Sequence, residues 1–146
     1  MVSGDLNGHV FYSHYQTGEI GGLFGTHKDS VESIVMSKVQ PICVSAGIDT
    51  TINIYDLNTM SLRSKIVPSE YGGYTKLVFS NILTHVVYAS STLGDMQMID
   101  VRDGTVVKTF KGHAAPINDF MEIKELELLV TAGDDHQCFV FDLKNI

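Results

Sequence analysis

The sequence contains no tryptophan, only two cysteines and three prolines, and no long apolar run. A membrane-spanning helix needs about 20 consecutive, mostly apolar residues, so we expect none. Residues 1–10 are interrupted by glycines and polar residues, which is unlike a signal or transit peptide. Cys43 and Cys138 lie far apart and form no CxxC pair. We expect both to be small core residues. Two unpaired cysteines fit a protein in a reducing compartment, for which the cytoplasm is the expected location and the nucleus the alternative.

The acidic side chains outnumber the basic ones by 17 to 10, which gives a formal net charge of −7. Nucleic acids and anionic membranes bind positively charged surfaces, so we expect neither as a direct partner. The charge favours a basic protein or peptide. A mild negative charge also keeps many cytosolic domains soluble, and the charge alone does not separate these two explanations.

A segment of hairpin character recurs along the chain. Two copies are residues 44–57 and 130–143. Residues 88–101 form a degenerate copy between them, and residues 3–13 form a partial copy. The closing residues Asp56, Asp100 and Asp142 are 44 and 42 residues apart. Each copy has two short runs rich in Val, Ile, Phe, Tyr and Thr around a turn, as a β-hairpin does. The period is that of four-stranded propeller blades.

Two of the copies share further residues at equal spacing. His27 and His113 each precede a closing aspartate by 29 residues, and Asp49 and Asp135 precede it by seven. This arrangement resembles the WD-repeat family, whose blades carry a Gly-His pair, a turn aspartate and a closing Trp-Asp. The resemblance implies an all-β propeller that serves as a protein-binding scaffold.

In that family a network of hydrogen bonds among His, Asp, Ser/Thr and Trp joins the strands of a blade. The resemblance places seven residues in such networks: His27, Ser45, Asp49, Tyr55, His113, Thr131 and Asp135. Tyr55 stands at the Trp position and keeps a hydroxyl for the network, whereas Ile99 and Phe141 do not. A His/Asp pair that recurs from blade to blade indicates a structural role, with a catalytic or metal-binding pair as the alternative.

The middle copy departs from this pattern. Leu93 replaces the turn aspartate, and Glu70 or Tyr71 stands where the histidine is expected. We therefore expect this blade to lack the network and to be held by apolar packing alone.

The repeat predicts about three and a half four-stranded blades of a seven- or eight-blade ring. Residues 1–26 are expected to be the end of an incomplete blade, with strands near 9–13 and 19–24. Residues 27–68 and 69–111 are expected to form one blade each. Residues 112–146 are expected to form a last blade without its outer strand. The sequence thus resembles the C-terminal half of a longer propeller. Because an open arc exposes strand edges, we expect the missing half or a second copy to close the ring.

Several stretches resemble one branch of the family more than a generic repeat, namely the angio-associated migratory cell protein family. They are residues 52–57, 61–63, 86–88, 110–113 and 117–120. The fungal member of that family is a ribosome-assembly protein, a dedicated chaperone of one basic protein of the large ribosomal subunit. The resemblance implies cytoplasmic work on a newly made basic client.

Propellers usually bind partners with the loops that join the second strand to the third and one blade to the next. The residues expected there are Asp29, Glu32, Glu70, Tyr71, Tyr74, Asp95 and Asp134, with Lys28 as the basic residue of the set. Acids on one face accelerate association with a Lys/Arg-rich peptide and make it sensitive to salt, and tyrosines supply contact area. The alternative is that turns favour Asp for local backbone hydrogen bonds.

Signals for catalysis or a cofactor are weak. Residues 18–25 contain four glycines, but no Gly-Lys-Ser/Thr follows, as a phosphate-binding loop requires. Adjacent side chains on a strand point to opposite faces, which disfavours joint metal binding by Asp134, Asp135 and His136. We therefore expect no catalytic, cofactor-binding or metal-binding residue. The competing functions are an adaptor in signalling or ubiquitin ligation, and a propeller hydrolase that would need His113 for turnover but not for stability.

Overall fold

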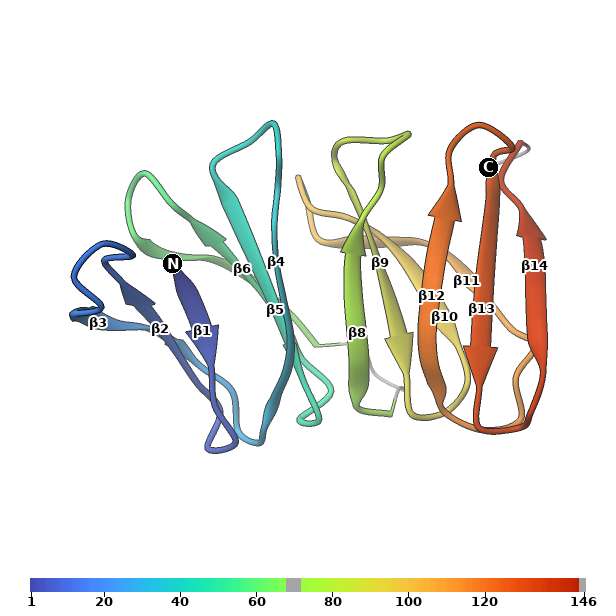
Figure 1. The fold of residues 1–146 in the computed structure, drawn as a ribbon, viewed down its shortest axis with the longest axis horizontal. Coiled ribbons are helices and arrows are strands. Elements are labelled where there is room, and N and C mark those ends of the chain that lie inside the picture. Colours follow the sequence, from blue (N-terminus) through green and yellow to red (C-terminus); the bar gives the residue numbers. More distant parts are fainter. Residues whose placement is uncertain (68–71, 145–146) are drawn as a thin grey trace.

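A computed structural model describes residues 1–67 and 72–144. These residues form 14 β-strands in four antiparallel sheets that stand side by side (Figure 1). No helix able to span a bilayer occurs in the described ranges. The predicted all-β partial propeller is confirmed.

Each sheet follows the chain order of its strands. The first sheet consists of β1 (Val2–Gly4), β2 (His9–Ser13) and β3 (Ile20–Thr26). The second consists of β4 (Val31–Met36), β5 (Ile42–Gly47), β6 (Ile52–Asp56) and β7 (Ser61–Ile66). The third consists of β8 (Tyr74–Phe79), β9 (Val86–Ser91), β10 (Met96–Asp100) and β11 (Thr105–Phe110), and the fourth of β12 (Ile117–Ile123), β13 (Leu128–Gly133) and β14 (Cys138–Asp142).

The first sheet has one strand more than the sequence predicts. Strand β1 pairs Ser3 with Phe11 and Gly4 with Val10 of β2. It has three residues, none of them buried, so it lacks the apolar run by which a strand is recognised in a sequence.

The core lies between neighbouring sheets. Strands β5 and β9 are buried at all six positions, because a sheet covers each of their two faces. Ile54 and Leu77 pack in the cluster between the second and third sheets. Met98 and Leu129 pack in the cluster between the third and fourth sheets.

The two cysteines differ in burial. Cys43 on β5 is fully buried, and burial raises the pKa of its thiol to about 12. Cys138 on β14 is exposed, so the expectation that both are core residues is wrong for this one. Strand β14 alternates exposed and half-buried residues, because no other sheet in the described ranges covers its outer face.

The first strands β1, β4, β8 and β12 contact one another in succession, which aligns the ends of the sheets. One end carries the connections 5–8, 27–30, 48–51, 92–95, 111–116 and 134–137, which we call the loop face, at the lower edge of Figure 1. The other end carries 37–41, 57–60, 80–85, 101–104 and 124–127, which we call the opposite face.

Candidate protein-binding site

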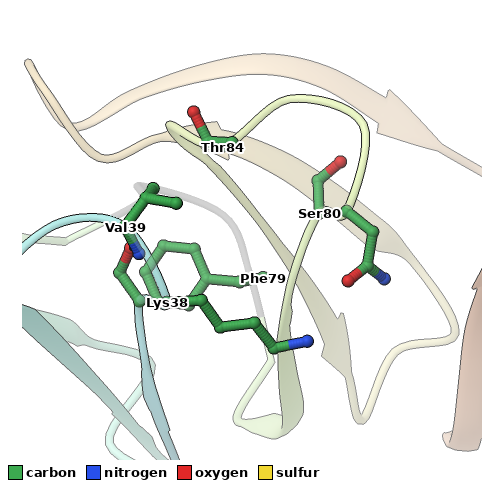
Figure 2. A pocket seen from close by; sticks show the side chains of 7 residues that line it. Lys38, Val39, Phe79, Ser80 and Thr84 are labelled. Carbon is green, nitrogen blue, oxygen red and sulfur yellow. The ribbon is translucent and has the colours of Figure 1, made fainter.

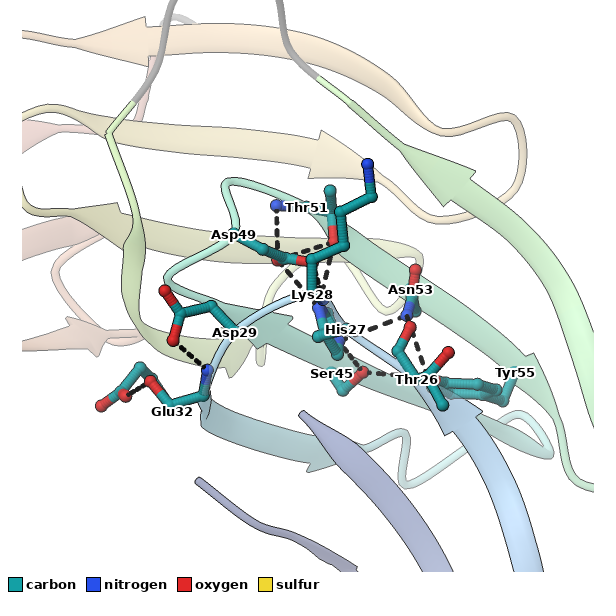
Figure 3. Close-up of polar contacts among 11 residues, drawn as sticks. Thr26, His27, Lys28, Asp29, Glu32, Ser45, Asp49, Thr51, Asn53 and Tyr55 are labelled. Atoms are coloured by element: carbon teal, nitrogen blue, oxygen red, sulfur yellow. Dashed lines mark hydrogen bonds and ion pairs between the residues drawn. The ribbon is translucent and has the colours of Figure 1, made fainter. Parts of the chain in front are cut away.

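A buried hydrogen-bond network supports the loop face at the second sheet (Figure 3). The Nδ1 atom of His27 lies 3.0 Å from a carboxylate oxygen of Asp49, and its Nε2 atom lies 2.7 Å from the Ser45 hydroxyl. The Ser45 hydroxyl lies 3.2 Å from that of Tyr55, so the tyrosine at the Trp position takes part in the network. Asn53, which the sequence analysis missed, donates its amide to the Tyr55 hydroxyl at 3.1 Å.

The Asp49 carboxylate joins the two loops of this blade. It accepts the backbone N–H of Lys28 at 2.8 Å from the loop before β4, and that of Thr51 at 3.1 Å in its own hairpin turn. Burial raises the pKa of this carboxyl, but the hydrogen bonds from Lys28, His27 and Thr51 outweigh burial, and the net pKa is lowered. A charged carboxylate that accepts backbone N–H groups from two loops fixes the geometry of those loops.

The fourth sheet repeats this arrangement. The Nδ1 atom of His113 lies 2.8 Å from Asp135, and its Nε2 atom lies 2.8 Å from the Thr131 hydroxyl. The Asp135 carboxylate also accepts the backbone N–H of Ala114 at 3.0 Å. The hydrogen bond with His113 is the main cause that lowers the pKa of Asp135. Phe141 adds no polar contact here, as its chemistry predicts.

The third sheet has a polar network of different composition. The Tyr74 hydroxyl donates to the Gln97 amide oxygen at 2.6 Å, and the Thr75 and Ser90 hydroxyls lie 2.8 Å apart. The Thr75 hydroxyl also donates to the carbonyl of Ile117 in the next sheet at 2.9 Å. The expectation that apolar packing alone holds this blade is therefore wrong. A tyrosine, a glutamine and two hydroxyls form hydrogen bonds in place of the His/Asp pair of the other two blades.

Four of the predicted partner-binding acids lie on or beside the loop face in the described residues. Figure 3 shows Asp29 and Glu32. Asp29 accepts the backbone N–H of Ser30 at 2.8 Å, and Glu32 accepts the Ser30 hydroxyl at 2.5 Å. Asp134 accepts the amide of Asn118 at 2.5 Å. Asp95 is half-buried at the end of its turn.

Three of these acids, Asp29, Glu32 and Asp134, have neutral partners, and the Asp95 carboxylate accepts no hydrogen bond within residues 1–67 and 72–144. None of them forms an ion pair with a lysine or arginine within residues 1–67 and 72–144. Lys28 is exposed on this face as expected, and so is Lys111, which the sequence analysis did not place there. The hydrogen bonds hold the carboxylates of Asp29, Glu32 and Asp134 in position and leave their negative charge uncompensated.

The tyrosines predicted to assist are not available as contact residues. Tyr74 is fully buried, so its assignment to a partner-binding surface is wrong, because β8 begins at this residue and turns the ring into the core. Glu70 and Tyr71 lie outside the described residues. Beside the loop face, Lys76 and Asp119 form an ion pair between the third and fourth sheets, which the sequence analysis did not predict.

Within the described ranges, no group of three or more His, Cys, Asp or Glu side chains is arranged to hold a metal ion. The networks around His27 and His113 join neighbouring loops and bury their polar groups. The loop face therefore carries its acids on a support of hydrogen-bonded loops.

Comparison with known proteins agrees with the repeat architecture of the chain. The family model described as WD domain, G-beta repeat matches residues 18–56 and 104–142. Angio-associated migratory cell protein of Homo sapiens is 34% identical over 80% of this chain and 26% of its own length. An uncharacterized WD repeat-containing protein of Schizosaccharomyces pombe is 26% identical over 99% of the chain and 36% of its own length. Cilia- and flagella-associated protein 52 of Bos taurus is 28% identical over 97% of the chain and 23% of its own length.

The chain spans between about a quarter and a third of the length of these relatives. Proteins built from such repeats generally act as non-enzymatic scaffolds for protein interactions. The chain belongs to the WD-repeat family.

Proposed function

We propose that the chain is part of a scaffold that binds a Lys/Arg-rich segment of a partner on its loop face. The observation that carries the proposal is that Asp29, Glu32, Asp95 and Asp134 lack a cationic partner in the described part of the chain. An exposed ion pair contributes only about 0–1 kcal/mol. Several acids on one face together steer a basic partner and raise its association rate.

We further propose that this partner is a newly made basic protein of the large ribosomal subunit, and that the scaffold acts as its dedicated chaperone in the cytoplasm. This finer proposal is supported by the resemblance to the angio-associated migratory cell protein family and its fungal ribosome-assembly member. A basic client needs its charge shielded from nucleic acid before assembly, and an acidic face supplies that shield.

Charge reversal on the two faces tests the binding mode. We expect Glu32→Lys to weaken the binding of a fluorescent Lys/Arg-rich peptide about 3- to 10-fold at about 50 mM salt, and to flatten the salt dependence. The matched control is Glu125→Lys, an exposed acid on the opposite face, and it should bind like the wild type. Equal losses in both variants would show that only the net charge matters, which contradicts a site on the loop face.

The identity of the client is tested by affinity capture. A tagged pull-down at low and moderate salt, read by mass spectrometry, should return one dominant basic ribosomal protein that is lost as salt rises. Acidic or phosphorylated partners that survive salt would instead indicate an adaptor in signalling or ubiquitin ligation. That result would remove the chaperone proposal.

A further inference from the structure

A small pocket opens on the opposite face, between the second and third sheets (Figure 2). It is lined by the β4–β5 loop, the end of β8 and the β8–β9 loop, through Ser37, Lys38, Val39, Phe79, Ser80, Asn81 and Thr84. Its volume is about 170 Å³. Pockets for small molecules usually begin near roughly 300 Å³, so this one suits a single side chain.

The walls of the pocket are fixed by hydrogen bonds. The Ser37 hydroxyl accepts two backbone N–H groups of its own loop at 3.1 and 3.3 Å, and the Ser80 hydroxyl accepts two of its loop at 2.9 and 3.1 Å. Ser80 also donates to Glu122 of β12 at 2.6 Å. A pocket with such walls exists before a partner arrives, which lowers the entropy cost of binding.

The lining combines an apolar floor with an unpaired positive charge. The ring of Phe79 faces Val39, whose exposed fraction is 63%. Lys38 lies beside them (Figure 2), and it forms no ion pair or hydrogen bond with another residue in 1–67 or 72–144. No carboxylate lines the pocket. The matching occupant is an apolar group with a negative charge next to it.

We propose that this pocket binds an acidic segment of a partner protein, which inserts one leucine or phenylalanine side chain against Phe79 and pairs a neighbouring carboxylate with Lys38. The site lies at the other end of the sheets from the acidic loop face and selects the opposite charge. The net charge of −7 does not prevent such binding, because charges farther away than about 8 Å are screened at physiological salt. Two such faces allow the scaffold to hold a basic and an acidic partner together.

The test uses the isotope-labelled 146-residue chain and the peptide Ser-Asp-Glu-Leu-Asp-Glu-Ser. We expect the peptide to shift the backbone amide resonances of Lys38, Val39 and Asn81 in two-dimensional NMR spectra. A peptide with serine in place of leucine, and one with lysine in place of each acid, should leave these resonances unchanged. Absence of shifts at millimolar peptide, or equal shifts from the basic peptide, would overturn the proposal.

A matched pair of variants separates this pocket from general charge effects. Lys38→Glu removes the positive charge and adds a negative one, and we expect it to weaken peptide binding at least about fivefold. Lys65→Glu makes the same change on exposed β7 of the same sheet, and it should bind like the wild type. Equal weakening in both variants would also overturn the proposal.

Discussion

The Nδ1 atom of His113 lies 2.8 Å from a carboxylate oxygen of Asp135, although the two residues are 22 positions apart in the chain. This contact joins the loop before β12 to the hairpin turn between β13 and β14. The contact between His27 and Asp49 joins the matching loops of the second sheet at 3.0 Å. The same geometry in two sheets explains how short polar loops keep a fixed position at the edge of a β-fold.

We expect His113→Ala to lower the free energy of unfolding by about 1–3 kcal/mol. The imidazole is almost fully buried, with a side-chain exposed fraction of 1%, and its loss leaves the Asp135 carboxylate and the Thr131 hydroxyl without their shared partner. Urea unfolding followed by circular dichroism measures the change. His14→Ala serves as the control. His14 is exposed, so this variant should unfold like the wild type. An unchanged midpoint for His113→Ala would remove the structural assignment and reopen a catalytic one.

Acid should unfold the chain partly through Asp49. The net pKa of this carboxyl is lowered in the folded state from the usual 3.8, so the carboxylate stabilises the fold at pH above that value. The stabilisation is lost as pH falls through the folded pKa, because the proton then binds the native state as well. The stability difference between the wild type and Asp49→Asn should therefore shrink as pH falls from about 7 to about 2.5.

The measurement is the urea midpoint as a function of pH. Glu19→Gln is the control, because Glu19 is exposed and the variant should follow the wild-type curve. A difference between the wild type and Asp49→Asn that stays constant down to the lowest pH would contradict a role for the charge of Asp49.

The sequence was sufficient for the hairpins and the repeat, because these depend on local turn residues and alternating apolar positions. It was not sufficient for features that depend on neighbouring sheets. The exposure of Cys138 depends on whether a sheet covers β14, and the burial of Tyr74 depends on where β8 starts. Gln97 could not be paired with Tyr74 beforehand, since this pair is 23 residues apart and follows no repeat position.

The hairpin turns should respond in opposite ways to changes at equivalent positions. Gly94 has φ of +82°, and a Cβ there would lie 2.6 Å from the carbonyl oxygen of His113. Thr50 holds the same turn position with φ of 65°, which is unfavourable for a β-branched residue. We expect Gly94→Ala to destabilise the chain by at least about 1–2 kcal/mol and Thr50→Gly to stabilise it by up to about 1 kcal/mol.

Thermal unfolding of the two variants beside the wild type gives the signs directly. A lower melting temperature for Thr50→Gly would show that contacts of the threonine side chain outweigh the relief of backbone strain. A wild-type melting temperature for Gly94→Ala would show that the turn moves away from the His113 loop at little cost.

Glu122 should be the most sensitive acid between the third and fourth sheets. Its carboxylate accepts the Asn81 backbone N–H at 2.5 Å and the Tyr88 hydroxyl at 3.2 Å. Burial, and then the charge of Glu122, raise the pKa of Tyr88, so that hydroxyl stays protonated and donates. Glu122→Ala leaves these donors without an acceptor, and we expect a loss of about 2–3 kcal/mol.

Glu122→Gln keeps the size of the side chain but brings an amide donor toward these donors, so we expect an intermediate loss of about 1–2 kcal/mol. Glu125→Gln is the matched control, an exposed residue in the turn after the same strand. Amide hydrogen exchange should report faster exchange at Asn81 in both Glu122 variants, because its N–H loses the carboxylate. If stability falls while the Asn81 amide exchanges at the wild-type rate, Glu122 acts through its own strand and does not fix the loop that borders the pocket on the opposite face.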